Sequence, residues 1–220
     1  MNNTLLRVPS SPWALLIDGS ALFFGQRSVS PDRNMNYVAL KEQLEKENRS
    51  GVAPKTAFFF TAADEGNPNQ VKFNDMIRNS IGWHVHQVAP HEASIVNPLL
   101  DEQAPRIIRF DSMIAYALGR LTAGKAVPAD LDASPVARVF IVSDSWALAG
   151  PVRDCVSRGT GVTMVFFGSL IDNRWHKVFR DAEKSGGRLD FFDLDAVVQR
   201  LFDRVRPSKK GAEDLLPGLP

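Results

Sequence analysis

The chain has 220 residues, of which 44% are hydrophobic and 23% are charged, and its formal net charge is +1. This length is enough for one sizeable domain, and the near-zero charge provides no overall field for a polyanionic partner, so any nucleic-acid surface must be a local patch. Cys155 is the only cysteine, which excludes an internal disulfide and a cysteine-based metal cluster.

The N-terminus and the hydropathy pattern bear on localisation. Residues 1–11 are polar and contain a single basic residue, Arg7, so they lack the charged start and apolar core of a signal peptide. Apolar runs along the chain stay well short of the length that a membrane-spanning helix needs. We therefore expect a cytoplasmic protein that does not bind a membrane.

Short apolar runs alternate with amphipathic segments from one end of the chain to the other. The apolar runs predict buried strands over residues 13–17, 56–61, 83–88, 137–142 and 162–168, with a short strand or extended turn over 189–192. Helical spacing or composition predicts helices over 37–49, 69–80, 111–121, 146–158, 173–184 and 194–205, and a helix or wide turn begins at 21–25. Loops are expected over 31–36, 91–103 and 122–135.

Alternating strands and helices favour an α/β fold. We expect a three-layer α/β/α arrangement in which a mostly parallel central sheet is covered by helices on both faces. Residues 1–12 and 206–220 are expected to be flexible ends, and residues 13–205 to form a single domain.

The first strand runs directly into Asp18, Gly19 and Ser20. Asp18 therefore stands at the carboxyl end of a buried strand, where open α/β sheets place their ligands. A carboxylate there is costly to desolvate unless it is paired, hydrogen-bonded or bound to a cation. Two interpretations stay open at this stage, a ligand-binding acid and an Asp that caps the following helix.

Two further acids recur at places of the same kind. Asp144 follows the strand at 137–142, and Asp111 opens a helix, where the helix dipole alone favours a negative charge. If Asp18, Asp111 and Asp144 meet at one edge of the sheet, they must share a proton or a divalent cation. Oxygen-only ligation suits Mg²⁺ or Mn²⁺, and such an ion supports hydrolysis of phosphodiester bonds.

His84 and His86 point to one face of the strand at 83–88. They are metal-ligand types, but no partner ligand lies nearby in the sequence. A surface position is the favoured interpretation.

The order of these motifs resembles the NYN domain family, a branch of the PIN-like metal-dependent ribonucleases. The matching segments are 16–25, 59–65, Asp111 at the start of its helix, 140–145, 161–165 and 191–194. The resemblance implies a sheet with helices on both faces, an acidic cluster at the carboxyl edge that binds Mg²⁺ or Mn²⁺, and cleavage of single-stranded or structured RNA. Carried over by position, Asp18, Asp111 and Asp144 match family acids.

The chain departs from the family pattern at three positions. Ala21 stands where the family usually has Asn, Ala117 lies near the place of a further Asp, and Trp146 stands where the third motif has a second acid. Fewer ligands make a two-metal site doubtful, although a single ion on three carboxylates still fits. Asp64 and Glu65 would compensate if their loop folds over the edge.

Two functions follow as hypotheses. The first is a metal-dependent ribonuclease in which Asp18, Asp111 and Asp144 hold the ion, Ser20 and Ser143 orient ligands or water, and Arg106 and Arg109 contact the RNA backbone. The second is a catalytically inactive RNA-binding or protein-interaction module on the same scaffold. A weaker third is an adaptor that recruits proteins through the loop 122–135 and the tail 207–220. A homo-oligomer or a protein partner stays open in each.

Overall fold

The structure is a computed structural model, and it describes residues 12–48, 52–62, 67–88, 94–96, 107–124 and 135–202. The ends expected to be flexible therefore lie almost entirely outside the described residues. So do Asp64, Glu65, Arg106 and most of the loop 122–135. Within these ranges no helix is long and apolar enough to cross a membrane.

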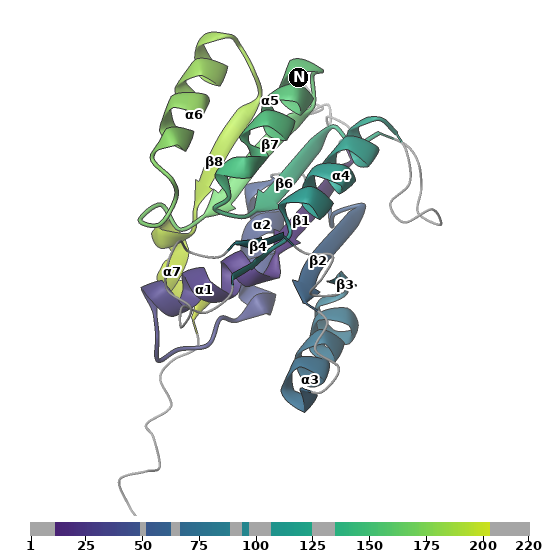
Figure 1. The fold of residues 1–220 in the computed structure, drawn as a ribbon, viewed down its shortest axis with the longest axis vertical. Coiled ribbons are helices and arrows are strands. Elements are labelled where there is room, and N and C mark those ends of the chain that lie inside the picture. Colours follow the sequence, from purple (N-terminus) through teal and green to yellow (C-terminus); the bar gives the residue numbers. More distant parts are fainter. Residues whose placement is uncertain are drawn as a thin grey trace, which may run out of the picture.

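A parallel sheet forms the centre of the fold (Figure 1). Six strands make up this sheet, in the order β3-β2-β1-β6-β7-β8, and every neighbouring pair is parallel. The strands are β1 (Trp13–Asp18), β2 (Thr56–Ala62), β3 (His84–Val88), β6 (Arg138–Val142), β7 (Gly161–Phe166) and β8 (Leu189–Asp193). The expected α/β class with a parallel sheet is thus confirmed.

Helices connect the strands and cover both faces. They are α1 (Gly19–Val29), α2 (Tyr37–Glu47), α3 (Pro68–Met76), α4 (Asp111–Thr122), α5 (Ala149–Ser157), α6 (Arg174–Lys184) and α7 (Val198–Leu201). A π-helical turn, η1 (Ile77–Ile81), extends α3, and 3₁₀ turns η2 (Trp146–Leu148) and η3 (Leu194–Val197) precede α5 and α7. The segment predicted as a closing helix is helical over 194–201, as η3 followed by α7, and its helix ends at Leu201 because Phe202 leaves the helical region and bridges to Met35; residues 203–205 lie outside the described residues.

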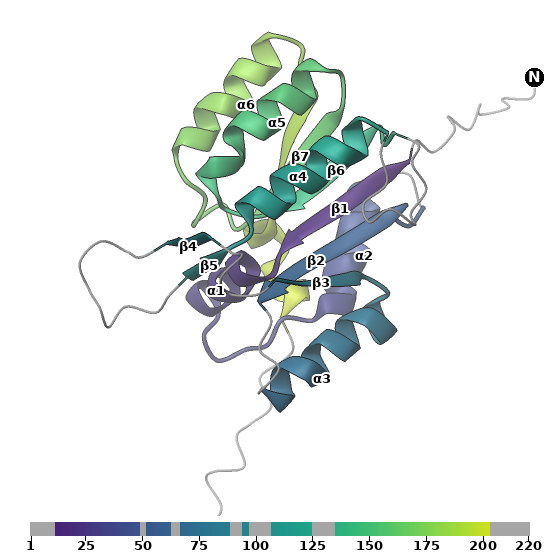
Figure 2. The same ribbon diagram turned by 45° about the vertical axis from the view of Figure 1, so that its right-hand side comes forward.

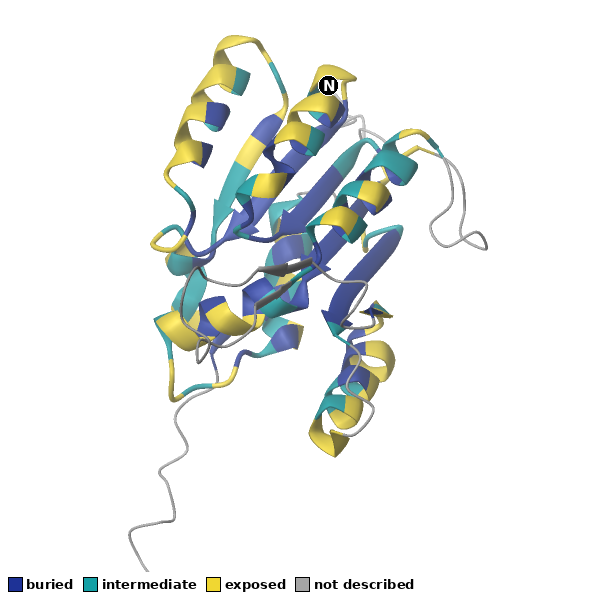
Figure 3. Ribbon diagram, viewed as in Figure 1, coloured by how far each residue is buried: buried dark blue, intermediate teal, exposed yellow. Residues whose placement is uncertain are grey.

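Each central strand is buried on both sides, as Figure 3 shows. Residues of β1 alternate between the two layers: Leu16 packs under α4, α5 and α6, whereas Leu15 packs under α1, α2 and η1. This explains why the strand sequences are unbroken apolar runs rather than alternating ones.

A short antiparallel pair interrupts the region expected to be a loop. β4 (Ser94–Val96) pairs with β5 (Ile107–Arg109), so the prediction of a loop over 91–103 is wrong at 94–96. In Figure 2 this pair lies beside α1 and the start of α4. Its consequence is positional, since β5 ends at Arg109 near the carboxyl edge of the main sheet.

The sheet reverses its direction of growth between β1 and β6. From β1 the chain adds β2 and β3 on one side and then returns to place β6, β7 and β8 on the other. Open α/β sheets bind ligands at such a reversal, outside the carboxyl ends of the strands. Asp18 is the last residue of β1, and Asp144 lies in the loop after β6.

Candidate active site

Asp18 joins the end of β1 to the start of α1. Its Oδ1 accepts a hydrogen bond from the Ala21 amide at 2.9 Å, so it is the N-cap of α1. Its Oδ2 is buried and has no hydrogen-bonding partner among the described residues. Burial raises the pKa of Asp18 to about 7; the cap lowers it, the charges of Asp111 and Asp144 raise it, and Arg109 lowers it. The capping interpretation is therefore confirmed through Oδ1, whereas the ligand-binding interpretation stays a prediction that concerns Oδ2.

Asp111 is the first residue of α4. The N-cap is Phe110, which provides no side-chain cap, so Asp111 is not the capping residue. Its Oδ1 is buried and likewise lacks a partner in the described structure. Burial raises the pKa of Asp111, against a hydrogen bond with Ser145 and the charge of Arg109, which lower it. A second carboxylate oxygen is thus left without a donor.

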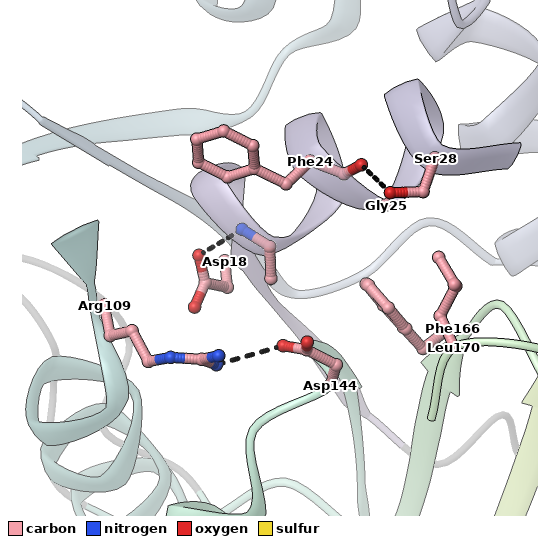
Figure 4. Close-up of a pocket in the computed structure, with 9 residues that line it drawn as sticks. Asp18, Phe24, Gly25, Ser28, Arg109, Asp144, Phe166 and Leu170 are labelled. Atoms are coloured by element: carbon pink, nitrogen blue, oxygen red, sulfur yellow. Dashed lines mark hydrogen bonds and ion pairs between the residues drawn. The ribbon is translucent and has the colours of Figure 1, made fainter. Parts of the chain in front are cut away.

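Asp144 lies two residues beyond β6 and pairs with Arg109. The distance from Arg109 Nη1 to Asp144 Oδ1 is 3.2 Å, and the two side chains are 26% and 29% exposed. Arg109 enters from β5, and Figure 4 shows its guanidinium reaching across to Asp144 with Asp18 nearby. The structure therefore places one cation among the three predicted acids.

A small cleft of about 190 Å³ lies at the sheet reversal, and Asp111 is not among the residues that line it. Asp18, Asp144 and Arg109 provide its polar wall, while Phe24 of α1 and Phe166 at the end of β7 belong to its apolar wall. One wall carries the charged groups and the other is apolar, and charges beside apolar groups interact more strongly than they do in bulk water.

The charges of the cleft do not balance by themselves. Asp18, Asp144 and Arg109 leave a net charge of −1 in the cleft when all are ionised, and Asp111, whose charge interacts with those of Arg109 and Asp144, adds a further −1. The described residues contain no group of three or more His, Cys, Asp or Glu side chains already gathered as a metal site. Asp18 Oδ2 and Asp111 Oδ1 are buried oxygens with no donor among the described residues, and carboxylate oxygens are the ligand type that hard cations take. Asp144 is engaged by Arg109.

The two predicted serines lie differently from one another. Ser20 lines a second cavity on another side of α1. Ser143 is buried and its Oγ accepts from the Ser145 amide at 3.2 Å, which shapes the turn that carries Asp144. Sequence reasoning missed Ser145, which hydrogen-bonds to Asp111. Its only signal was a second hydroxyl directly after Asp144.

The three departures from the family pattern have different surroundings. Ala21 lines the cleft, whereas Ala117 is 1% exposed on the buried face of α4 and belongs to the core. Trp146 packs edge-on against Trp175, with 5.6 Å between the ring centroids. The Arg174 guanidinium lies 4.6 Å from the centroid of the Trp146 ring. Trp146 therefore fills the layer between η2 and α6.

His84 and His86 lie exposed on β3, each with its ring 5.6 Å from a phenylalanine of β2. Their partners are Phe58 and Phe60. This agrees with the surface interpretation.

Comparison with protein-family models gives no match, and comparison with curated proteins gives none either. Among solved structures, a Vibrio parahaemolyticus protein of unknown function is similar, with a TM-score of 0.59 and 15% identity over 89% of this chain and 98% of that one. That similarity shows a shared fold. A Staphylococcus aureus nicotinamidase matches with a TM-score of 0.35 and 12% identity over 82% and 98% of the two chains, which is too distant to support an inference.

Proposed function

We propose that the protein is a metal-dependent ribonuclease whose reaction takes place in the cleft between β1 and β6. One observation carries the proposal: two buried carboxylate oxygens, Asp18 Oδ2 and Asp111 Oδ1, have no donor in the described structure. Their charges interact with each other and with Asp144. A divalent ion would neutralise the net charge of −2, and the resemblance to the NYN family supports RNA as the substrate.

Asp111 and the charged residues of the cleft each have a role in this proposal. Asp18 and Asp111 hold Mg²⁺ or Mn²⁺, which when bound supplies a Lewis acid and an activated water. Arg109 holds a phosphate of the RNA, since a guanidinium matches phosphate oxygens in charge and shape. Asp144 holds Arg109 in place before RNA binds, and its carboxylate would be available as a further oxygen ligand for the ion once a phosphate pairs with the guanidinium.

The test is cleavage of end-labelled single-stranded RNA with Mg²⁺, with Mn²⁺ and with EDTA. Asp18→Asn and Asp111→Asn should each abolish ion-dependent cleavage, because each removes a charged ligand. Asp190→Asn is the matched control, since Asp190 is an exposed acid on β8 whose arginine partner is Arg138. Cleavage that persists in EDTA or in Asp18→Asn would contradict the proposal.

A second candidate is a non-catalytic RNA-binding module on this fold. It is favoured by the Arg109–Asp144 ion pair, which already neutralises one acid of the cleft. In that case the wild-type protein would bind the labelled RNA with no cleavage in either ion. Binding would then depend on Arg109, whereas Asp18→Asn would leave it unchanged.

A further inference from the structure

A second, larger cavity lies against α1. Its volume is about 610 Å³, compared with about 190 Å³ for the acidic cleft, and it lies between α1, α3 and the end of β2. Phe24 lines both, so the two openings are neighbours across one helix. A volume of this size is typical of sites that hold a small organic group.

The wall of this cavity combines aromatic rings with side-chain amides. Phe23 and Phe24 come from α1, and Phe59 and Phe73 from β2 and α3. The described lining residues carry one charge, that of Arg27. Flat rings and amides without acidic groups suit a planar, uncharged heterocycle, since amides present both donors and acceptors.

Two side-chain amides of the cavity wall, those of Gln26 and Gln70, are placed to contact such a ligand. The Gln70 Nε2 donates to the Thr61 hydroxyl at 2.8 Å, which fixes the side chain and leaves its carbonyl oxygen unused by that bond. Gln26 is 7% exposed, and its Oε1 is buried with no partner among the described residues. Glutamine and asparagine amides pair with the edges of nucleobases in just this chemistry.

The exposed side of α1 carries an aromatic pair at the mouth of the cavity. Phe23 and Phe24 are 45% and 38% exposed, and their ring centroids lie 5.5 Å apart. The Arg27 guanidinium lies 5.4 Å from the Phe23 centroid. Exposed rings accompanied by a cation are the means by which proteins stack bases of single-stranded nucleic acid.

We infer that the larger cavity holds a nucleobase of the same RNA chain whose phosphodiester lies in the acidic cleft, which rests on the proposed function. An α-helix with its side chains is about 10–12 Å across, so the base belongs to a nucleotide only a few positions from the scissile phosphate. Phe23 and Phe24 stack the base at the entrance, and Gln26 and Gln70 contact its edge.

The test measures binding of a fluorescently labelled 12-nucleotide single-stranded RNA in EDTA, where no cleavage occurs. Phe23→Ala and Gln70→Leu should each weaken binding by about 5-fold or more. Phe23→Ala removes a stacked ring, and stacking of one base is worth about 1–3 kcal/mol. Gln70→Leu removes the amide that contacts the edge of the base. Tyr116→Ala is the matched control. Tyr116 is 59% exposed on α4, with the Arg120 guanidinium 5.9 Å from its ring, and lies on neither cavity; its removal should leave binding unchanged.

A series of RNAs with one abasic nucleotide each locates the base. Wild type should bind the RNA more weakly when the abasic nucleotide stands at one or two positions of the series. For Phe23→Ala, an abasic nucleotide at those positions should cause no further loss of affinity. Equal affinities of Phe23→Ala, Gln70→Leu and Tyr116→Ala, or no binding of RNA by wild type, would overturn the inference. If the cavity bound a segment of a protein instead of a base, Phe23→Ala, Gln70→Leu and Tyr116→Ala would bind the RNA with equal affinity.

The two proposals fail separately. RNA cleavage with unchanged affinity in Phe23→Ala would remove the base site and leave the nuclease. Position-specific loss of affinity without cleavage in Mg²⁺ or Mn²⁺ would retain the base site and remove the nuclease.

Discussion

The two oxygens of the Asp18 carboxylate lie in different surroundings. Its Oδ1 caps α1, and its Oδ2 is buried without a donor. The cap favours the charged form, yet burial outweighs the cap and raises the pKa to about 7. The fold therefore tolerates an unfavourable charge at the position where a ligand-binding acid is expected, and this cost is measurable.

Stability should fall as the pH rises from about 4 to 8. Because the native Asp18 keeps its proton up to about pH 7 while the unfolded chain loses it near 3.8, the native state binds more protons in this window and the free energy of unfolding decreases with pH. The decrease amounts to as much as about 4 kcal/mol. Asp18→Asn should remove most of this pH dependence, because it removes the buried carboxyl group. The variant should keep the start of α1, since Asn also caps helices well.

Urea unfolding at pH 5 and pH 8 in EDTA measures this difference. At pH 8 Asp18→Asn should be more stable than wild type, and Mg²⁺ should stabilise wild type but not the variant. Asp190→Asn serves as the exposed control. A wild-type protein that loses no more stability than Asp18→Asn between the two pH values would show that the buried carboxylate costs nothing.

At the scale of elements, α1 begins directly at the end of β1 and presses close to β2. A Cβ built on Gly19 would lie 2.6 Å from both the Phe60 carbonyl oxygen and the Phe59 ring. Since the carbonyl belongs to the backbone, it has little freedom to move. Gly19 is therefore required for close approach, and this approach sets the direction in which Asp18 enters the cleft.

Gly19→Ala should destabilise the protein by about 1–3 kcal/mol, the range for overpacking. Gly119→Ala is the matched control, because Gly119 lies within α4 and a Cβ there meets nothing within 4 Å. Alanine in that helix should stabilise the protein by about 0.5–1 kcal/mol. Thermal unfolding followed by circular dichroism distinguishes the two, and equal effects of the two substitutions would refute the close-approach argument.

At the scale of the whole molecule, the layers were predictable and the contents of the cleft only partly so. The central strands follow from unbroken apolar runs such as 13–17 and 137–142, because a strand buried on both faces leaves no room for polar residues. Asp18 and Asp144 were placed at one edge for the same reason. The two side chains come close to each other because neighbouring parallel strands end at the same edge of the sheet.

Arg109 was expected near this edge of the sheet, but its ion pair with Asp144 could not be read from the sequence. It depends on the pairing of β4 with β5, two strands of three residues each, which are too short to show a period. The contact of Ser145 with Asp111 depends on two segments brought together by the fold. Local patterns determine which elements form, whereas the electrostatics of the cleft depend on long-range pairing.

Two core layers share one sheet, and this predicts a single unfolding unit. Leu15 and Leu16 are adjacent on β1, are 1% and 0% exposed, and face opposite layers. Leu15→Ala and Leu16→Ala should each cost about 2–5 kcal/mol and lower the midpoint of the same transition. Val38→Ala, at a 50% exposed position on α2, should change stability by about 0.5 kcal/mol or less.

Scanning calorimetry separates one unit from two. If the sheet couples its layers, wild type and both leucine variants show one transition in which the calorimetric and van't Hoff enthalpies agree. If the layer under α4, α5 and α6 unfolded independently, Leu16→Ala would move one of two transitions and Leu15→Ala the other. Since every central strand contributes side chains to both layers, neither layer can lose its packing without exposing the strands that support the other.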